Sequence, residues 1–361
     1  MSRTALSILS TENLLHNISI IRAQAPRSKI VAMVKANAYG HGLRSTSLRL
    51  QAAIDMLGVS CIDEALALRK AGVKIPILLA EGVFEPRELI IASAEKFVVA
   101  FHSPIQIEWL KTTLMPRPIE AWLKINTGLG RLGFDMQEAA HSYESLTTHP
   151  TIKKPITIMS HFACADTPQD PLNAIQKERF NNVMNSMPGT YSICNSAALF
   201  TMPEMHYEYV RPGIAVYGVS PFTDRTAATL GLKPVMTVQS TLIAVQRMAK
   251  GSSLGYGARY TCPETMPVGV VAFGYGDGYP VTAQDGTPIL VNNKRCALAG
   301  RVSMDMLTVD LRNCPDATIG SQVILWGEGL PLEEVVTHTH TMRWEMLTSM
   351  QHRVQFLWTQ L

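Results

Sequence analysis

Short runs of apolar residues recur along the first two thirds of the chain, separated by stretches whose apolar positions have helical spacing. Each run is too short for a helix and fits a buried strand. Strands that alternate with helices pair in parallel, and eight of them predict a TIM-like (β/α)8 barrel. An open, doubly wound sheet is the alternative, but no G-x-G-x-x-G joins a strand to a helix here. The predicted strands cover residues 30–33, 56–60, 75–80, 97–101, 119–125, 156–161 and 191–194, and the eighth lies within residues 209–217.

The pattern changes from Leu232 onward, where alternating and apolar runs follow one another with little helical spacing. Asn292, Asn293 and Lys294 lie between two such runs and indicate a β-hairpin. One helix is predicted over residues 344–350. The last third therefore predicts a mostly β domain, with strands over 237–246, 268–273, 288–291, 296–298, 307–309, 322–326 and 354–358.

Composition excludes several classes of protein. The chain has 361 residues, enough for two domains with a sizeable core. Its 32 Lys and Arg nearly balance its 29 Asp and Glu, so nucleic acid is not an expected partner. The six cysteines form no C-x-x-C pair, and no stretch has the character of a signal peptide or a membrane span. His338 and His340 lack a third ligand nearby, so we expect no metal site. We expect a cytoplasmic protein without membrane contact.

Chemically active side chains gather where the predicted strands end. Taken singly, each has an ordinary structural explanation: a solvated lysine, a hydrogen-bonded histidine, a helix cap or a surface arginine. In a barrel, however, the carboxyl ends of all strands meet at one rim, where catalytic groups lie. One shared site explains these residues better than five coincidences. They are Lys35, Lys124, His161, Asn195 with Ser196, and Arg211 with Pro212 and Gly213.

These side chains suit one cofactor. The amine of Lys35 can form an imine with an aldehyde. Ser196, Tyr39 and nearby backbone amides can donate hydrogen bonds to a phosphate, and Gly213 permits close approach of the backbone. His161 offers a flat face on which a ring can stack. Together they predict a site for pyridoxal 5′-phosphate, an electron sink that the protein binds and tunes.

With these motifs assembled, the chain resembles the alanine racemase family of barrel-type pyridoxal-phosphate enzymes. The similarity extends from about residue 5 to about residue 354 and rests on ordered blocks, each of which is weak alone. The blocks are VKANAYGHG at 34–42, LKINTGLGRLG at 123–133, SHFA at 160–163, NSAA at 195–198, VRPGI at 210–214, GYG at 255–257, GYGDGYP at 274–280 and GRVSMD at 300–305.

The resemblance implies a catalytic pair. Lys35 would hold the cofactor as the Schiff-base lysine and act as one acid/base group, and Tyr256 would be the opposing base. Arg131 would orient the substrate carboxylate, and Met304 would supply a backbone amide. Lys124 matches a position that carries a carbamate in many relatives, which would present an anion to Arg131.

The same resemblance implies the cofactor contacts. His161 would lie beside the ring and also bond the catalytic tyrosine. Arg211 would face the pyridine nitrogen. The remaining cofactor-binding positions are Asn195 and, at the phosphate, Tyr39, Ser196, Gly213 and Ile214.

Three positions depart from the family pattern. Asn126 stands where many relatives carry Asp, which removes one possible anion near Arg131. Val281 follows Pro280 where relatives commonly have Arg. His352 stands where some members place a tyrosine on the phosphate.

The resemblance also implies a division of the chain into two domains. Residues 9–229 would form the cofactor-binding barrel, and residues 230–361, with a strand over 1–8, would form the β domain. Because Tyr256 and Met304 lie in the β domain, the resemblance implies a homodimer in which each β domain completes the partner's active site. The implied activity interconverts L-alanine and D-alanine by two bases acting on a pyridoxal-phosphate aldimine, for peptidoglycan synthesis or for alanine catabolism.

Three other functions stay open. One is a racemase of the same architecture for serine, lysine or a broad range of amino acids. Another is a decarboxylase that also has a barrel and a β domain. The third is a non-catalytic pyridoxal-phosphate carrier; such proteins are single barrels, and a second domain that carries Tyr256 and Met304 counts against this class.

Overall fold

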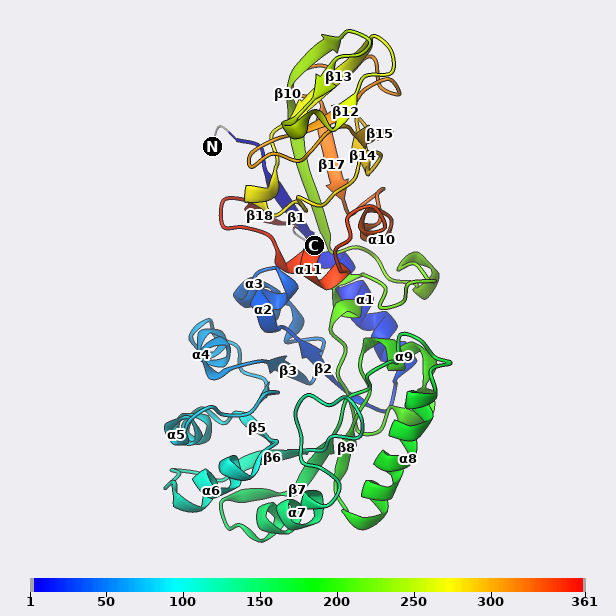
Figure 1. Ribbon diagram of the computed structural model, residues 1–361. Helices are drawn as coiled ribbons and strands as arrows, with labels where there is room; N and C mark the ends of the chain where they lie inside the picture. The colour runs from blue at the N-terminus through cyan, green and yellow to red at the C-terminus, as the bar shows by residue number, and fades with distance from the viewer. Residues whose placement is uncertain (1–2, 360–361) are drawn as a thin grey trace.

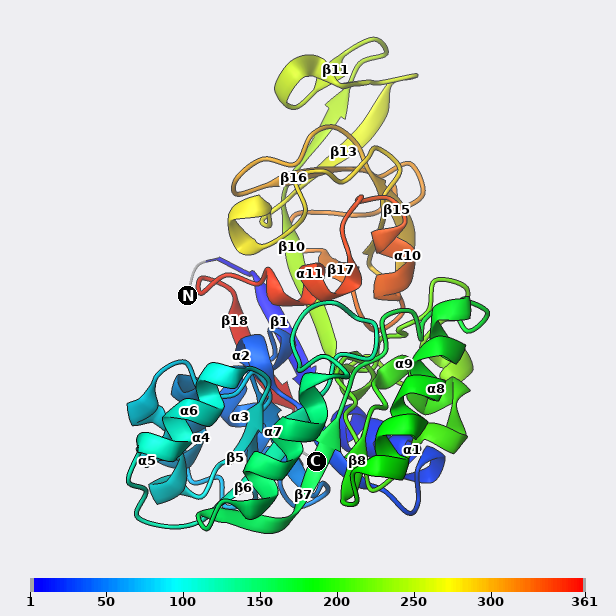
Figure 2. The same cartoon turned by 60° about the horizontal axis from the view of Figure 1, so that its bottom comes forward.

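The barrel predicted from the first two thirds of the chain is confirmed. The computed structural model describes residues 3–359 and contains a sheet of eight parallel strands (Figures 1 and 2). The strand order is β8-β7-β6-β5-β4-β3-β2-β9. The strands are β2 (Lys29–Met33), β3 (Met56–Val59), β4 (Ile77–Leu79), β5 (Val98–Phe101), β6 (Ile119–Lys124), β7 (Ile152–Met159), β8 (Thr190–Ser192) and β9 (Tyr209–Val210).

The two end strands, β8 and β9, meet through a side chain and through the backbone that follows them. Ser192 Oγ donates to the carbonyl oxygen of Tyr209 (2.9 Å), and the Arg211 amide donates to the carbonyl oxygen of Cys194 (2.9 Å). The barrel is therefore nearly closed. The segment 209–217, predicted to hold the eighth strand, contains it as the short β9 at its start, because Pro212 cannot donate to a ladder. The segment Ile214–Tyr217 instead forms a 3-10 helix, η2.

Helices cover the outside of the barrel (Figure 2). Helix α1 begins after Ser10, whose Oγ accepts from the Asn13 amide (3.1 Å) as an N-cap. Acidic residues in the first turn of α4 and basic residues in its last turn complement the helix dipole. The helices of this part are α1 (Thr11–Gln24), α2 (Lys35–Tyr39), α3 (Leu43–Leu50), α4 (Ile62–Lys70), α5 (Pro86–Glu95), α6 (Pro104–Thr112), α7 (Glu138–Thr148), α8 (Pro171–Ser186), α9 (Ser196–Thr201), η1 (Pro203–Met205) and η3 (Ala228–Leu230).

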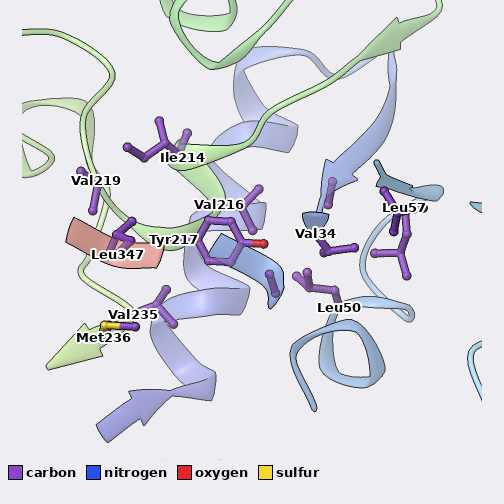
Figure 3. Packing of buried hydrophobic residues seen from close by; sticks show 14 of the residues in the cluster. Val34, Leu50, Leu57, Ile214, Val216, Tyr217, Val219, Val235, Met236 and Leu347 are labelled. Carbon is purple, nitrogen blue, oxygen red and sulfur yellow. The ribbon is translucent and has the colours of Figure 1, made fainter. Parts of the chain in front are cut away.

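Two apolar clusters hold this part together. The larger one lies between the strands and their helices and continues into the second domain. Figure 3 shows Tyr217 within it, beside Val216 and between Val34 and Leu347. The smaller cluster contains Val31, Met33, Met56, Leu78, Val98, Ala100, Trp122 and Met159. All eight of these residues lie on strands whose other residues face the helices, as expected for the filled interior of a barrel.

The last third forms the mostly β structure that the pattern predicts. Strand β10 pairs with β17, β1 and β13, so that six strands close on themselves in the order β13-β16-β15-β14-β17-β10. The strands are β1 (Leu6–Ser10), β10 (Met236–Met248), β13 (Met266–Val271), β14 (Pro288–Val291), β15 (Lys294–Leu298), β16 (Leu307–Asp310), β17 (Gln322–Trp326) and β18 (Gln355–Thr359). A separate pair, β11 (Ser253–Leu254) and β12 (Tyr260–Thr261), flanks η4 (Tyr256–Ala258), and the other short helices are η5 (Tyr275–Asp277), α10 (Leu332–Val336) and α11 (Arg343–Thr348).

The first residues of the chain belong spatially to this second sheet. Strand β1 lies antiparallel to β10 and parallel to β18, so the sheet combines residues from both ends of the sequence. Of the predicted strand over 1–8, residues 1–2 lie outside the described part of the chain, as do residues 360–361 of the predicted β domain.

Helix α11 joins the two parts of the molecule, where it lies between the β sheet and α2 (Figure 1). The contact is close at Gly40, which has a φ of +79°. A Cβ at Gly40 would lie only 1.9 Å from the carbonyl oxygen of Leu347 in α11. Glycine is therefore required at Gly40 by both its backbone conformation and this approach. Among residues 3–359, no helix is long and apolar enough to cross a membrane.

Candidate active site

A cavity of about 820 Å³ opens at the carboxyl ends of the barrel strands. Ten of the twelve residues assigned to the site from the sequence line it. Their shared position confirms that the strand ends meet at one rim, as the barrel geometry predicts. The ten are Lys35, Tyr39, Lys124, Arg131, His161, Asn195, Ser196, Arg211, Gly213 and Ile214.

The other two residues, Tyr256 and Met304, do not line this cavity. They lie in the β domain, and their side chains are 70% and 54% exposed. A large aromatic and a large apolar side chain at this exposure have no packing partner of their own to explain them. Within this chain the two residues are separated from the cavity that their predicted roles require.

Lys35 begins a turn of unusual backbone conformation. The four residues Ala36, Asn37, Ala38 and Tyr39 all have φ between +50° and +56°, which is a turn of left-handed helix. For residues other than glycine this conformation costs about 1–2 kcal/mol each. The sequence predicted a loop with glycines here, and it did not predict this turn. A strained backbone conformation of this kind persists only where contacts with the surrounding structure stabilise it.

The surroundings of this turn supply hydrogen bonds to its backbone. The carboxylate of Glu64 in α4 accepts from the Ala36 amide (2.8 Å) and from the Ser60 amide (2.9 Å). Asn37 Oδ1 accepts from the Leu43 amide (2.8 Å). Glu64 therefore joins the loop that follows β2 to the loop that follows β3.

Two rings also support the turn from inside. His41 Nδ1 lies 2.8 Å from the carbonyl oxygen of Tyr39, to which it donates. The Tyr217 ring stacks on Tyr39 with centroids 4.9 Å apart, and its hydroxyl donates to the carbonyl oxygen of Met33 (2.9 Å). Burial raises the pKa of Tyr39 to about 12, so its hydroxyl keeps its proton and can donate.

A cradle of small groups lies opposite Lys35. Ser196 Oγ accepts from the Gly213 amide (2.8 Å), and Asn195 Oδ1 caps α9 by accepting from two of its backbone amides. A Cβ at Gly213 would lie 2.3 Å from the hydroxyl oxygen of Tyr39. The cradle thus has room for the tyrosine hydroxyl only because residue 213 has no side chain.

Arg211 and His161 form a hydrogen-bonded pair that lines the cavity. Arg211 is 4% exposed, and its Nη2 donates to His161 Nδ1 (3.1 Å) and to the carbonyl oxygen of Ser160. Burial lowers the pKa of Arg211 to about 10, which still leaves it charged at neutral pH. Burial, followed by the charge of Arg211, holds the pKa of His161 well below its ordinary value. The imidazole is therefore neutral, with its proton on Nε2.

Lys124 ends β6 with its amine in the same cavity. It is 6% exposed, and within residues 3–359 its Nζ makes no hydrogen bond to protein. Burial lowers its pKa to about 8, and the charges of Arg211 and Arg131 act in the same direction. A substantial fraction of Lys124 is therefore a neutral, nucleophilic amine near neutral pH.

Arg131 lies on the loop that follows β6. The structure also shows where the three residues that depart from the family pattern lie. Asn126 Oδ1 accepts from the amides of Gly128 and Gly130 (3.1 and 3.0 Å), so this side chain shapes the loop that carries Arg131. Val281 and His352 are exposed and do not line the cavity.

The sequence reasoning missed several residues that line the cavity. Glu81 lies two residues after the end of β4, so the same strand-end rule could have identified it, and its Oε1 lies 3.2 Å from Lys35 Nζ. Asp166 follows β7 on a longer loop. Met342 and Trp344 reach the rim from the start of α11, a placement that depends on how the two parts of the chain pack.

An eight-stranded parallel barrel with a lysine, a polar cradle and an arginine–histidine pair at its mouth, followed by a β domain, defines a two-domain barrel enzyme. Comparison with known proteins narrows the class. The sequence model described as "Alanine racemase, N-terminal domain" matches residues 9–221, and "Alanine racemase, C-terminal domain" matches residues 235–358. The chain belongs to the alanine racemase family.

Individual relatives resemble the chain over its whole length. An alanine racemase of Coxiella burnetii is 42% identical over 358 residues, covering 98% of each chain. One from Vibrio parahaemolyticus is 44% identical and covers 99% of each. The crystal structure of the biosynthetic alanine racemase from Pseudomonas aeruginosa has a TM-score of 0.96 at 38% identity, covering 99% of this chain and 100% of that one.

Proposed function

We propose that this protein is an amino-acid racemase that interconverts L-alanine and D-alanine. The observation that carries the proposal is the conjunction in one cavity of the Lys35 amine, the cradle at Gly213 and the Arg211–His161 pair. The relatives that match over almost the full length are named alanine racemases, which supports the choice of substrate.

We infer that the resident cofactor is pyridoxal 5′-phosphate, because the residues present fit it. Ser196 and the protonated Tyr39 hydroxyl can donate to a phosphate, and the missing side chain at Gly213 gives the Tyr39 hydroxyl the room to lie there. Asn195 and Ile214 complete this end of the site. When bound, the cofactor supplies an electron sink that makes the α hydrogen of an amino acid acidic.

The proposed work of the protein is to move a proton at the α carbon. Inversion needs one group on each face, because a single side chain does not reach both. Lys35 Nζ takes or returns the proton on the D-alanine face, and the hydroxyl of Tyr256 does so on the L-alanine face. His161 is neutral, so its Nε2–H can donate to the tyrosine oxygen.

Arg211 and Arg131 have separate proposed roles. The buried, charged Arg211 has only donors, so it opposes protonation of a ring nitrogen facing it. An unprotonated ring nitrogen would make the cofactor a weaker electron sink, which favours racemisation over transamination. Arg131, with the backbone amide of Met304, orients the substrate carboxylate. Lys124 is proposed to carry a carbamate, in which its neutral amine adds to carbon dioxide and releases one proton.

The proposal includes a homodimer with shared active sites. Tyr256 and Met304 are exposed in the β domain and do not reach the cavity of their own chain. A partner's β domain placed over the barrel mouth would supply both groups. We place the boundary between the two parts at residues 229 and 230, in the interval between the two matched segments. All six cysteines are free, which supports a cytoplasmic location.

One experiment tests the function directly. Purified protein is supplied with pyridoxal 5′-phosphate and L-alanine, and D-alanine is followed by chiral chromatography. Formation of D-alanine that disappears in Lys35→Ala supports the proposal, and its absence from the wild type contradicts it. A panel of L-amino acids identifies a serine, lysine or broad-specificity racemase. Release of carbon dioxide would identify a decarboxylase, and a protein that binds the cofactor but converts no amino acid would be a carrier.

A further inference from the structure

Glu81 provides the one carboxylate that contacts Lys35 within residues 3–359. Its Oε1 lies 3.2 Å from Lys35 Nζ, within hydrogen-bonding distance of the amine. The two side chains are 35% and 36% exposed, and both line the cavity. The ion pair between Glu81 and Lys35 therefore lies inside the candidate active site and not on the outer surface of the protein.

The backbone of Glu81 is fixed by contacts with the neighbouring loop. His102 Nε2 lies 3.0 Å from the carbonyl oxygen of Glu81, to which it donates. The next residue, Gly82, has a φ of +76°, and a Cβ there would lie 2.3 Å from the carbonyl oxygen of Ala100. This close packing fixes the backbone of the loop after β4, from which the Glu81 side chain extends towards Lys35.

The charges around this pair make the contact chemically significant. The cationic side chains of the cavity would each disfavour a positive charge on a neighbouring amine, whereas Glu81 favours it. Asp166 is the other acid of the cavity, but it does not bond Lys35. Tyr39 and His161 are neutral in this environment. The permanent cations that line the cavity are Arg131 and Arg211.

We propose that Glu81 is a positioning residue for Lys35, which accepts a hydrogen bond from its amine and holds the ammonium form at the rim. The inference rests on the proposed function, in which Lys35 exchanges a proton with the α carbon of D-alanine. As the C–H bond breaks, the proton passes to Nζ, and the ammonium group that results lies beside the carboxylate of Glu81. The reverse step returns the proton to carbon. Glu81 thus assists proton transfer on the face served by Lys35 alone.

The first test uses the enzyme loaded with pyridoxal 5′-phosphate in D2O. Proton NMR follows the initial loss of the α hydrogen of D-alanine and, separately, of L-alanine. Glu81→Gln keeps the size of the side chain and removes its charge, so exchange from D-alanine should slow about tenfold, with a much smaller effect on L-alanine. Glu85→Gln is the matched control, because Glu85 ends the same loop, pairs with Arg87 in α5 and does not line the cavity.

The second test needs no catalysis. Acetic anhydride acetylates only neutral amines, so mass spectrometry of the full-length protein, before cofactor is added, reports how well the ammonium form of Lys35 is held. Labelling of Lys35, normalised to the exposed Lys70, should become several-fold faster in Glu81→Gln and stay unchanged in Glu85→Gln.

Either of two results would overturn the inference: equal slowing of exchange from both enantiomers, or an unchanged rate of Lys35 labelling. The labelling measurement separates this inference from the proposed function. A wild-type protein that does not racemise alanine contradicts the function, whereas the labelling of Lys35 still decides the role of Glu81.

Discussion

At the scale of single residues, burial sorts the side chains of the cavity into charged and neutral groups. Arg211 remains charged because its pKa, lowered by burial, is still about 10. His161 beside it is neutral because burial and that charge act together on its pKa. Tyr39 keeps its proton, and Lys124, whose pKa is lowered to about 8, is partly neutral near neutral pH. The same low-dielectric environment thus leaves Arg211 charged and His161 neutral. It also keeps the Tyr39 hydroxyl as a hydrogen-bond donor and makes the Lys124 amine more nucleophilic.

Tyr256→Phe tests the division of work between the two bases. The variant retains Lys35, so the α hydrogen of D-alanine should still exchange with D2O, while exchange from L-alanine should fall by about 10²–10⁴. Inversion in both directions should fall with it. Proton NMR of each enantiomer in D2O measures this directly. Equal loss of exchange from both enantiomers would contradict the assignment of Tyr256 to one face.

The pKa of Lys124 predicts a pH dependence of its modification. Only the neutral amine adds carbon dioxide, and the pKa of Lys124 is lowered from its ordinary value to about 8. At a fixed concentration of dissolved carbon dioxide, the carbamate should therefore increase as pH rises through 8 and decrease below it. ¹³C NMR of protein equilibrated with labelled bicarbonate should detect a carbamate carbon. The signal should be absent from Lys124→Ala, and its persistence there would assign it to another lysine.

Most of the residues of the cavity could be predicted because they follow a strand directly. Lys35, Lys124 and His161 each come at or just after the end of an apolar run. Glu81 satisfies the same rule and was overlooked because a single acid at a strand end carries no distinctive pattern. Its significance depends on a distance to Lys35 that no local pattern contains.

At the scale of elements, the turn from Lys35 to Tyr39 shows where prediction from sequence stops. Ala36 and Ala38 have the highest helix propensity of all residue types, yet the turn that contains them is left-handed. Its conformation is imposed by partners far along the chain, Glu64 and Tyr217 among them. The short β9 differs in this respect, because the Pro212 that ends it is visible in the sequence.

Glu64→Gln should weaken this turn. An amide has one acceptor oxygen where the carboxylate has two, so either the Ala36 or the Ser60 amide loses its partner, at a cost of about 0.5–1.5 kcal/mol. We expect a lower midpoint of thermal unfolding and weaker binding of pyridoxal 5′-phosphate, followed by absorbance. Asp63→Asn, an exposed neighbour in the same helix turn, is the control and should change neither. Unchanged cofactor binding in Glu64→Gln would show that the turn holds its shape without this carboxylate.

At the scale of the whole molecule, the barrel and the mostly β domain could be predicted, because the period of the apolar positions differs between them. Their packing could not. The contact of α11 with Gly40 and the position of Trp344 at the rim arise between segments about 300 residues apart. The distance of Tyr256 from its own chain's cavity belongs to this scale as well, and it motivates the proposed dimer.

Mixing two inactive variants tests the shared site. In a hybrid of Lys35→Ala and Tyr256→Phe chains, one of the two sites combines an intact barrel with an intact partner tyrosine. Random pairing of equal amounts should therefore restore about a quarter of the wild-type activity. Co-expression with two different tags and measurement of L-alanine racemisation checks this. Mixtures that remain inactive, although tandem purification shows that hybrids form, would contradict a site shared between chains.

The placement of Lys35 and Tyr256 in different domains has a genetic consequence. A gene copy that lacks only Lys35 encodes a chain that still supplies Tyr256 to its partner. It should therefore behave as a recessive loss-of-function copy. A copy that lacks both residues inactivates each wild-type barrel with which it pairs. Expressed equally beside the normal gene, it should leave about a quarter of the sites active instead of half, and so act as a dominant inhibitor of the normal copy.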